Sequence, residues 1–415
     1  MDNAHSSLTI SRSVNQAMYG SLEDLISEDK LKEITADTIN GIPVLENGQV
    51  VLKPKDSHLD GLENQPEGYT DSDEYLSEFL QILKTRTVIV GVGGAGNNAI
   101  TRLQESGVTG AVTIAVNTDA QDLYYANADQ KLLIGKDVTG GLGSGNNPKI
   151  GEKAAESDLE RVRQITKKNI VFITCGMGGG TGTGASPIIA REAQKAGALV
   201  ISFCTLPFKM EGEEKKIVAY EGMLRLAQYS DTIIPLPNEK LMNLVPNLTL
   251  MKGFKIMDEI LIRSVRGIVD LVSNCGLVNL DLADVKNILS RSKGIGGYIG
   301  KSEINMEDIT RDSGSPALTP MVKEIIREKT LKALHNPILE IDPSEIHSCL
   351  VSITGNQYLT LAQVNEIVST VSANIQPDAK LKFGAMIDPN TDKIHINVIG
   401  QGPISPYLKA AQEQM

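Results

Sequence analysis

The sequence predicts an α/β protein in which a parallel-sheet domain is joined by a long central helix to a second, smaller α/β domain. The chain of 415 residues is long enough for two hydrophobic cores. Two regions, 85–248 and 305–402, alternate short apolar segments with amphipathic ones, the pattern of strands covered by helices. Between these regions, apolar residues recur at helical spacing.

The first region contains five apolar segments of strand length. In a parallel sheet the ligand lies beyond the carboxyl ends of the strands, and every glycine-rich or polar loop of this region falls there. We expect helices after the first and third segments, NNAITRLQESG and IIAREAQKAG. The five expected strands are TVIVGV (87–92), AVTIAVNTD (111–119), NIVFITCG (169–176), ALVISFCTLP (198–207) and TIIPLPN (232–238).

The central helix is predicted over residues 249–275. At about 1.5 Å per residue, some 24 residues span roughly 36 Å, the width of a small domain. Asn274 and Gly276 suit a left-handed cap at its end. Its apolar residues at three- and four-residue steps are Leu250, Phe254, Met257, Leu261, Val265, Ile268 and Val272.

The second region, 305–402, alternates helices and strands again. We expect a loop and connecting segment over 276–304 and a short tail over 403–415. The expected elements of the second region are the helix PMVKEIIREKTLKAL, the strand IHSCLVSITG, the helix TLAQVNEIVSTVSANI, and the strands KLKFGAMI and KIHINVIG joined by the turn DPNTD.

Residues 1–84 form an acidic extension that we expect to be largely flexible, with one helix over 21–34. It holds 16 acids and 6 bases of a chain whose net charge is −11, so the remainder is near neutral. A near-neutral body argues against a nucleic-acid groove. The sequence has neither a membrane-length apolar run nor a secretory signal, and its four cysteines form no CxxC pair, which favours reduced thiols in the cytoplasm.

Three glycine-rich segments follow strands or lie between elements: GVGGAGNNA (91–99), GLGSGNNP (141–148) and GMGGGTGTGASP (176–187). The first contains G-x-G-x-x-G, and with Asp119 as a ribose carboxylate it would fit an NAD-binding fold. That match alone is weak, and a tight turn without ligand explains one such loop equally well. Three glycine loops at one sheet edge exceed what turns require, so we predict a phosphate-binding site.

The third glycine loop has the features of a phosphate cradle without a lysine. Ser186 suits a helix cap and Pro187 the first helical position, so the glycines are expected just before a helix N-terminus. Free amides and the helix dipole there attract phosphate. Thr181 and Thr183 add hydroxyl groups. Phosphate charge would then be met by amides and by Mg²⁺ held mainly by phosphates and water.

Seven motifs in this order resemble the tubulin/FtsZ family, and FtsZ in particular, over residues 85–400. The resemblance implies a GTP-binding protein that hydrolyses GTP to GDP and phosphate and polymerises head to tail with copies of itself. The NAD(P)-dependent oxidoreductase remains a minor alternative, because all five histidines lie outside these loops. The motifs are GVGGAGNNA, NTDAQDL, GLGSGNNP, GMGGGTGTGASP, PFKMEG, PNEKL and GLVNLDLADVK.

The resemblance also implies which residues contact the nucleotide. Lys215 stands where the family has an arginine that partners the ribose-contacting Glu211, and Asp258-Glu259 stands where it has Asn-Asp. Glu259 is our choice for guanine specificity, with Phe254 covering the base and Asn238 in the base pocket. The loop residues implied to line the nucleotide and its phosphates are Gly93, Gly94, Ala95, Gly96, Asn97, Asn98, Gly179, Gly180, Thr181, Gly182, Thr183 and Gly184.

The implied catalytic residues are Asn279, Asp281 and Asp284, which polarise the attacking water in the nucleotide site of the next subunit. Acids at a helix start are also common without any catalytic role. Family members usually end in a linker and a membrane-tether peptide, whereas this sequence has a short tail. The difference allows two interpretations of its role. Either the acidic extension recruits a membrane-tethering adaptor to a mid-cell division ring, or the chain is a specialised filament protein outside central division. A structural filament protein that does not hydrolyse GTP is a further class, which the intact 279–284 loop disfavours.

Overall fold

The computed structural model describes most of the chain from residue 87 onward. The expected helix over 21–34 lies outside the described residues, as do Leu250, Phe254, Met257, Leu261, Ile268 and Val272 of the central-helix pattern. The described residues are 87–108, 110–240, 282–290, 296–310, 318–336, 339, 341–414 and, between 253 and 269, Gly253, Ile256, Glu259, Ile262, Val265, Arg266 and Val269.

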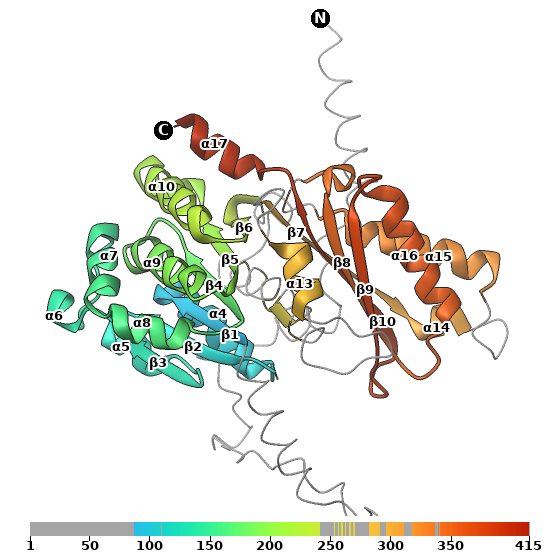
Figure 1. The fold of residues 1–415 in the computed structure, drawn as a ribbon, viewed down its shortest axis with the longest axis horizontal. Coiled ribbons are helices and arrows are strands. Elements are labelled where there is room, and N and C mark those ends of the chain that lie inside the picture. The colour runs from blue at the N-terminus through green and yellow to red at the C-terminus, as the bar shows by residue number, and fades with distance from the viewer. Residues whose placement is uncertain are drawn as a thin grey trace, which may run out of the picture.

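One ten-stranded sheet crosses the described part of the chain in the order β3-β2-β1-β4-β5-β6-β7-β10-β8-β9 (Figure 1). Its first six strands pair in parallel, and the five predicted strands of this region are confirmed. The added strand β3 is short, and its first two side chains, Gln130 and Lys131, are exposed, so it lacks an apolar pattern. The six strands are β1 (Thr87–Val92), β2 (Val112–Asn117), β3 (Gln130–Leu133), β4 (Ile170–Gly176), β5 (Leu199–Leu206) and β6 (Thr232–Pro237).

Helices cover both faces of this parallel sheet. Side chains alternate between faces along each strand, so apolar side chains of one strand pack against helices on both sides. Ile89 of β1 packs in one apolar cluster with α4, whereas Val88 and Val90 pack in another with α7, α9 and α10. Figure 1 shows α7–α10 gathered together over the N-terminal half. The helices are α4 (Gly93–Glu105), α5 (Ala120–Tyr125), α6 (Lys136–Thr139), α7 (Pro148–Ser157), α8 (Leu159–Thr166), α9 (Thr181–Lys195) and α10 (Glu213–Tyr229).

The second half adds four strands to the same sheet. Residues 296–304, expected within the connecting segment, form strand β7 together with Asn305, and β10 lies between β7 and β8 in antiparallel pairing. Strands β9 and β10 follow one another in the chain but are not neighbours, because β9 pairs in parallel with β8. The elements are α13 (Leu282–Leu289), β7 (Gly296–Asn305), α14 (Met306–Thr310), α15 (Pro320–Leu334), β8 (Ser348–Gly355), α16 (Leu361–Asn374), β9 (Lys380–Ile387) and β10 (Lys393–Gly402).

The two halves share one apolar core along one face of the sheet. The described residues of the central segment are helical, and Ile256, Ile262, Val265 and Val269 are buried in the cluster that also holds Ile89 and residues of the second half. Their three- and four-residue steps agree with a central helix. Across the junction, Ile233 of β6 pairs with Gly296 of β7.

The C-terminal residues 403–415, expected to be a short tail, include a helix, α17 (Pro406–Gln414). Its Leu408 and Ala411 are fully buried in the cluster that includes Met223 and Leu226 of α10, so the helix returns to the first half (Figure 1). Among the residues that the structure describes, no helix is long and apolar enough to cross a membrane. Cys175, Cys204 and Cys349 are buried free thiols.

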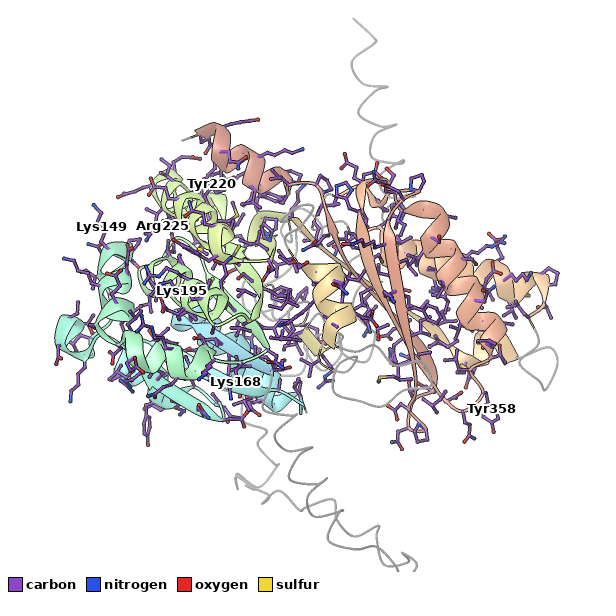
Figure 2. The ribbon with its side chains drawn as sticks, in the orientation of Figure 1. Lys149, Lys168, Lys195, Tyr220, Arg225 and Tyr358 are labelled. Carbon is purple, nitrogen blue, oxygen red and sulfur yellow. The ribbon has the colours of Figure 1, made fainter. Side chains whose placement is uncertain are left out.

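A buried carboxylate links α8 to α9 on the face of the sheet that α7–α10 cover. The side chain of Glu192 is only 2% exposed and accepts from Arg163 Nε at 2.8 Å, Lys195 Nζ at 2.9 Å and Arg191 Nε at 3.0 Å. Lys195, labelled in Figure 2, lies at the end of α9. Burial alone would raise the pKa of Glu192, but the hydrogen bonds from the three cations lower it to about 2.

We predict that Glu192→Gln lowers the free energy of unfolding at pH 7 by about 3 kcal/mol, because three cations lose their shared charge partner. The folded-state pKa of Glu192 lies below the ordinary 4.5, so its contribution is full above pH about 4.5 and disappears as the pH falls toward 2. The variant should therefore differ from the wild type at pH 7 and converge with it only as the pH falls through about 2. Urea denaturation followed by circular dichroism checks both.

Glu160→Gln is the matched control, because Glu160 also pairs with Arg163 but its side chain is 77% exposed. We expect a change within about 0.5 kcal/mol for this variant at every pH. Equal losses in the two variants would contradict the importance of the buried carboxylate.

Candidate nucleotide-phosphate site

The three glycine-rich segments lie at one edge of the sheet. The first begins α4 directly after β1, the third follows β4, and β1 and β4 are adjacent parallel strands. Gly93 adopts the left-handed region at φ 72°, and a Cβ there would lie 2.9 Å from the amide nitrogen of Gly182. A Cβ on Gly96 would lie 2.5 Å from the carbonyl oxygen of Thr174. Glycine therefore lets the backbones of α4 and α9 approach closely.

The start of α9 differs from the sequence prediction. Ser186 and Pro187 were expected at the cap and first helical position, which is wrong, because α9 begins at Thr181 with Gly180 as its N-cap residue. The Ser186 hydroxyl instead donates to the carbonyl of Gly182. All residues from Thr181 to Pro187 are buried, so tertiary packing of these small residues overrides the low helix propensity of glycine and proline. Gly182 and Thr183 are thus in the first helical turn.

The first turn of α9 offers backbone amides to an anion. The first intrahelical bond runs from Gly184 N to Gly180 O, so the amides of Thr181, Gly182 and Thr183 have no acceptor within the helix. The helix dipole adds partial positive charge at this end. Gly178 N donates to Thr183 Oγ1 at 2.9 Å, which leaves the Thr183 hydroxyl proton for another acceptor. This geometry suits phosphate oxygens.

Two predicted asparagines carry buried polar atoms that have no partner among the described residues. Asn97 in α4 is 1% exposed, and neither its Oδ1 nor its Nδ2 makes a hydrogen bond. Asn238, directly after β6, is 7% exposed and its Oδ1 is likewise unpaired. Buried polar groups are nearly always paired, so these atoms point to a polar ligand. Gly94, Ala95 and Asn98 are exposed at the same segment.

Asp119, which the dinucleotide-binding alternative needs as a ribose ligand, has a structural role. Its Oδ1 accepts from the backbone amides of Gln121 at 2.9 Å and Asp122 at 3.1 Å and so caps α5. Asp122 receives a 2.6 Å hydrogen bond from Asn117 Nδ2. Burial, with a smaller effect of Asp119, raises the pKa of Asp122 despite that bond. Asp122 Oδ2 would lie 3.2 Å from a Cβ on Gly94, so a carboxylate borders the first glycine segment.

Glu211 and Lys215 form an ion pair over the third glycine segment. Lys215 Nζ donates to Glu211 Oε2, and Glu211 Oε1 accepts from Phe208 N at 2.8 Å. A Cβ on Gly178 would lie 2.8 Å from Lys215 Cγ, so the stem of this lysine packs on the loop. The structure therefore brings both predicted residues to the glycine loop.

Asp284, the predicted carboxylate of the 279–284 loop that the structure describes, does not lie at this site. Asp284, at the start of α13, pairs at 3.2 Å with Lys382 of β9. Strand β9 is six positions from β4 in the sheet, about 29 Å at 4.8 Å per strand. Asn279, Asp281, Phe254 and Asp258 lie outside the described residues, and Glu259 lies half-buried in a helical segment.

Sequence reasoning missed two residues at this edge, Thr118 and Ser144. The hydroxyl of Thr181 lies 2.6 Å from that of Thr118 and 3.0 Å from that of Ser144. Thr118 stands in the motif NTDAQDL and Ser144 in GLGSGNNP, so a hydroxyl residue in each motif was the signal that the sequence offered. Both are buried in the structure. Ser144 belongs to the second glycine segment, which therefore joins the other two.

Comparisons with known proteins identify the family of this chain. Residues 86–246 match the tubulin/FtsZ family GTPase domain, and residues 322–403 match the FtsZ family C-terminal domain. The chain is 43% identical over 352 residues to cell division protein FtsZ 1 of Methanocaldococcus jannaschii, covering 84% of this chain and 88% of the relative. It is 43% identical over 344 residues to cell division protein FtsZ of Methanothermobacter thermautotrophicus, covering 82% and 86%.

Solved structures give the same result. The chain is similar to an empty FtsZ dimer of M. jannaschii at 42% identity with a TM-score of 0.69, covering 80% of this chain and 93% of that one. It also shares the fold of CetZ2 from Haloferax volcanii at 22% identity with a TM-score of 0.66, covering 80% and 97%. The chain therefore belongs to the FtsZ family, and it carries the tubulin/FtsZ GTPase domain followed by the FtsZ C-terminal domain.

Proposed function

We propose that this chain holds GTP across the three glycine segments and hydrolyses it with carboxylates supplied by a second copy of itself. Membership of the family makes it a GTP-binding GTPase of the division cytoskeleton. The observation that carries the proposal is the separation between the phosphate-binding edge, at β1 and β4, and Asp284, beside β9. In one chain these groups do not meet, whereas head-to-tail stacking presents the 279–284 loop of one subunit to the glycine segments of the next.

In this proposal the phosphates bind at the first turn of α9, where Gly179, Gly180, Thr181, Gly182, Thr183 and Gly184 lie. Gly93, Gly94, Ala95, Gly96, Asn97 and Asn98 line the nucleotide from α4, and Glu211 with Lys215 serves the ribose. Asn238 and Phe254 contact the base. Glu259, with Asp258, accepts from guanine N1 and N2 and so selects guanine over adenine. The unpaired atoms of Asn97 and Asn238 support this placement because they need polar partners.

For hydrolysis, Asn279, Asp281 and Asp284 of the neighbouring copy orient a water toward the γ-phosphate. Water adds to phosphorus, the bond to the β-phosphate oxygen breaks, and GDP and phosphate leave. Phosphoryl transfer depends mainly on positioning the water and neutralising charge, so carboxylates that arrive with the neighbour make turnover depend on assembly. The phosphate-binding edge alone binds GTP without cleaving it.

Mg²⁺ fits the site as a companion of the phosphates. The carboxylate nearest the first glycine segment, Asp122, already accepts from Asn117, and no group of three candidate metal ligands occurs among the described residues. Mg²⁺ keeps several waters and binds through substrate phosphates with few protein ligands. It would supply charge neutralisation there, while the amides of α9 position the phosphates.

Asn97→Ala tests the nucleotide placement. We expect at least a tenfold loss of GTP and GDP affinity, because buried ligand groups lose their partner. The midpoint of urea denaturation of the nucleotide-free protein should stay unchanged or rise, since the substitution removes two unpaired buried atoms. Titration calorimetry measures the affinity. Asn127→Ala, at an exposed asparagine, is the control. Unchanged affinity in Asn97→Ala would place the ligand elsewhere.

Asp284→Ala tests the catalytic role of the 279–284 loop. The variant should bind GTP with wild-type affinity and hydrolyse it at least 100-fold more slowly, because the attacking water loses its orienting carboxylate. Asp281→Ala should behave alike. Asp378→Ala removes an exposed carboxylate of a turn and should keep full turnover. Phosphate release at saturating GTP measures the rates. Normal turnover in both loop variants would contradict the catalytic role of the 279–284 loop.

Turnover per subunit should rise with protein concentration, because each active site needs two copies. Sedimentation with GTP should show filaments over the same concentration range. Among the similar proteins, solved structures include an FtsZ dimer and a CetZ2 protofilament. A flat concentration dependence without sedimenting filaments would instead favour a monomeric GTP-binding protein.

The acidic extension, residues 1–84, is our candidate for recruiting a membrane-tethering adaptor to a division ring in the cytoplasm. Its excess of acid over the near-neutral body supports a separate role. Fluorescently tagged protein lacking residues 1–84 should lose mid-cell localisation and keep its GTPase activity. Mid-cell rings without the extension would contradict this role, and the absence of rings with the full chain would favour a specialised filament protein.

A further inference from the structure

We propose that Thr118 and Ser144 are positioning residues that set the first turn of the phosphate-binding helix α9 through the hydroxyl of Thr181. The inference rests on the proposed GTP site. Thr181 Oγ1 lies 2.6 Å from Thr118 Oγ1 and 3.0 Å from Ser144 Oγ. Thr118 is fully buried, and Ser144 and Thr181 are 6% and 7% exposed. This hydroxyl triad brings together residues far apart in the chain, 63 and 37 positions from Thr181.

Each outer member of the triad is itself fixed by backbone hydrogen bonds. The carbonyl of Thr118 accepts from Gly143 N at 3.2 Å, and its amide donates to Asn117 Oδ1 at 2.8 Å. The carbonyl of Ser144 accepts from Asn147 N at 3.0 Å, where α7 begins. Thr118, directly after β2, and Ser144, within the second glycine segment, therefore hold fixed positions, and Thr181 is held between them.

Thr181 is the first helical residue of α9, so its position sets the direction of the amides that follow. Glycine gives this turn little intrinsic order, because Gly180, Gly182 and Gly184 lose more conformational freedom than other residues. Where a P-loop uses a lysine on the phosphates, the buried hydroxyl cluster here would order the backbone amides that bind them. Ordering the turn before GTP arrives lowers the entropy cost of binding.

The triad also leaves one proton over. Each hydroxyl has one proton and two lone pairs, and the two hydrogen bonds of the triad use two of the three protons. The third proton is available to a phosphate oxygen beside the helix terminus. The cluster therefore combines positioning with a hydrogen-bond donor at the place where negative charge binds.

The test compares Thr118→Val, which keeps the shape and removes the hydroxyl, with Thr118→Ser, which keeps the hydroxyl. We expect Thr118→Val to weaken GDP and GTP binding about tenfold and Thr118→Ser to stay within twofold of the wild type, measured by titration calorimetry. At saturating GTP and high protein concentration the kcat of Thr118→Val should stay within twofold, so the loss appears in KM. Ser144→Ala should weaken binding similarly, and the double variant should lose less than the product because both act through Thr181.

Thr166→Val is the matched control, because its fully buried hydroxyl bonds within α8 and should leave binding unchanged. Wild-type affinity in both Thr118→Val and Ser144→Ala, or equal losses in Thr118→Val and Thr118→Ser, would overturn the positioning role. Ser144→Ala decides the matter if Thr118→Val fails to fold. Failure of the wild type itself to bind guanine nucleotides would overturn the proposed function instead, so the two failures are distinguishable.

Discussion

Close backbone approach at the phosphate-binding edge is the constraint on which the site depends. A Cβ on Gly93 would press on Gly182, one on Gly96 on Thr174, and one on Gly184 on the carbonyl of Pro148. Because these glycines carry no Cβ, α4, α7 and α9 can pack closely around the end of β4. The many glycines are therefore needed first for close packing and, in the proposed site, for phosphate binding. The same absence of side chains that lets the helices approach one another also exposes the amides of α9.

In a phosphate site without a lysine, neutral groups must form the hydrogen bonds to the phosphate oxygens. Amides and hydroxyls cost less to bury than a charge, but each needs a partner when no ligand is bound. The structure handles them differently. The hydroxyls of Thr118, Ser144 and Thr181 satisfy one another, whereas the amide of Asn97 remains unpaired for the ligand. The hydroxyls thus have partners within the protein, whereas Asn97 would gain its partners from the nucleotide in the proposed site.

The sequence predicted the parallel sheet of the first half, its five long strands and the two long helices of the second half, α15 and α16, because apolar periodicity is a local property. It failed at the start of α9, where burial of TGTGAS between neighbouring elements, rather than propensity, extends the helix six residues earlier than Pro187 suggests. It also gave no sign of the pairing of Asp284 with Lys382, nor of Thr118 with Thr181. Such contacts join distant segments, and only the fold determines which of them meet.

The position of Asp284 is the basis of the proposed division between GTP binding and hydrolysis. A carboxylate next to the γ-phosphate of its own chain would repel that phosphate and would orient a water for hydrolysis before assembly. Here the acid is held by Lys382 on the far strands of the sheet, and its helix α13 contacts β8, β9 and β10, in the half of the molecule away from the phosphate-binding edge. In the proposed mechanism, one sheet thus separates binding from cleavage within a chain, and copies stacked head to tail bring the two together. Assembly would then be the step that permits hydrolysis.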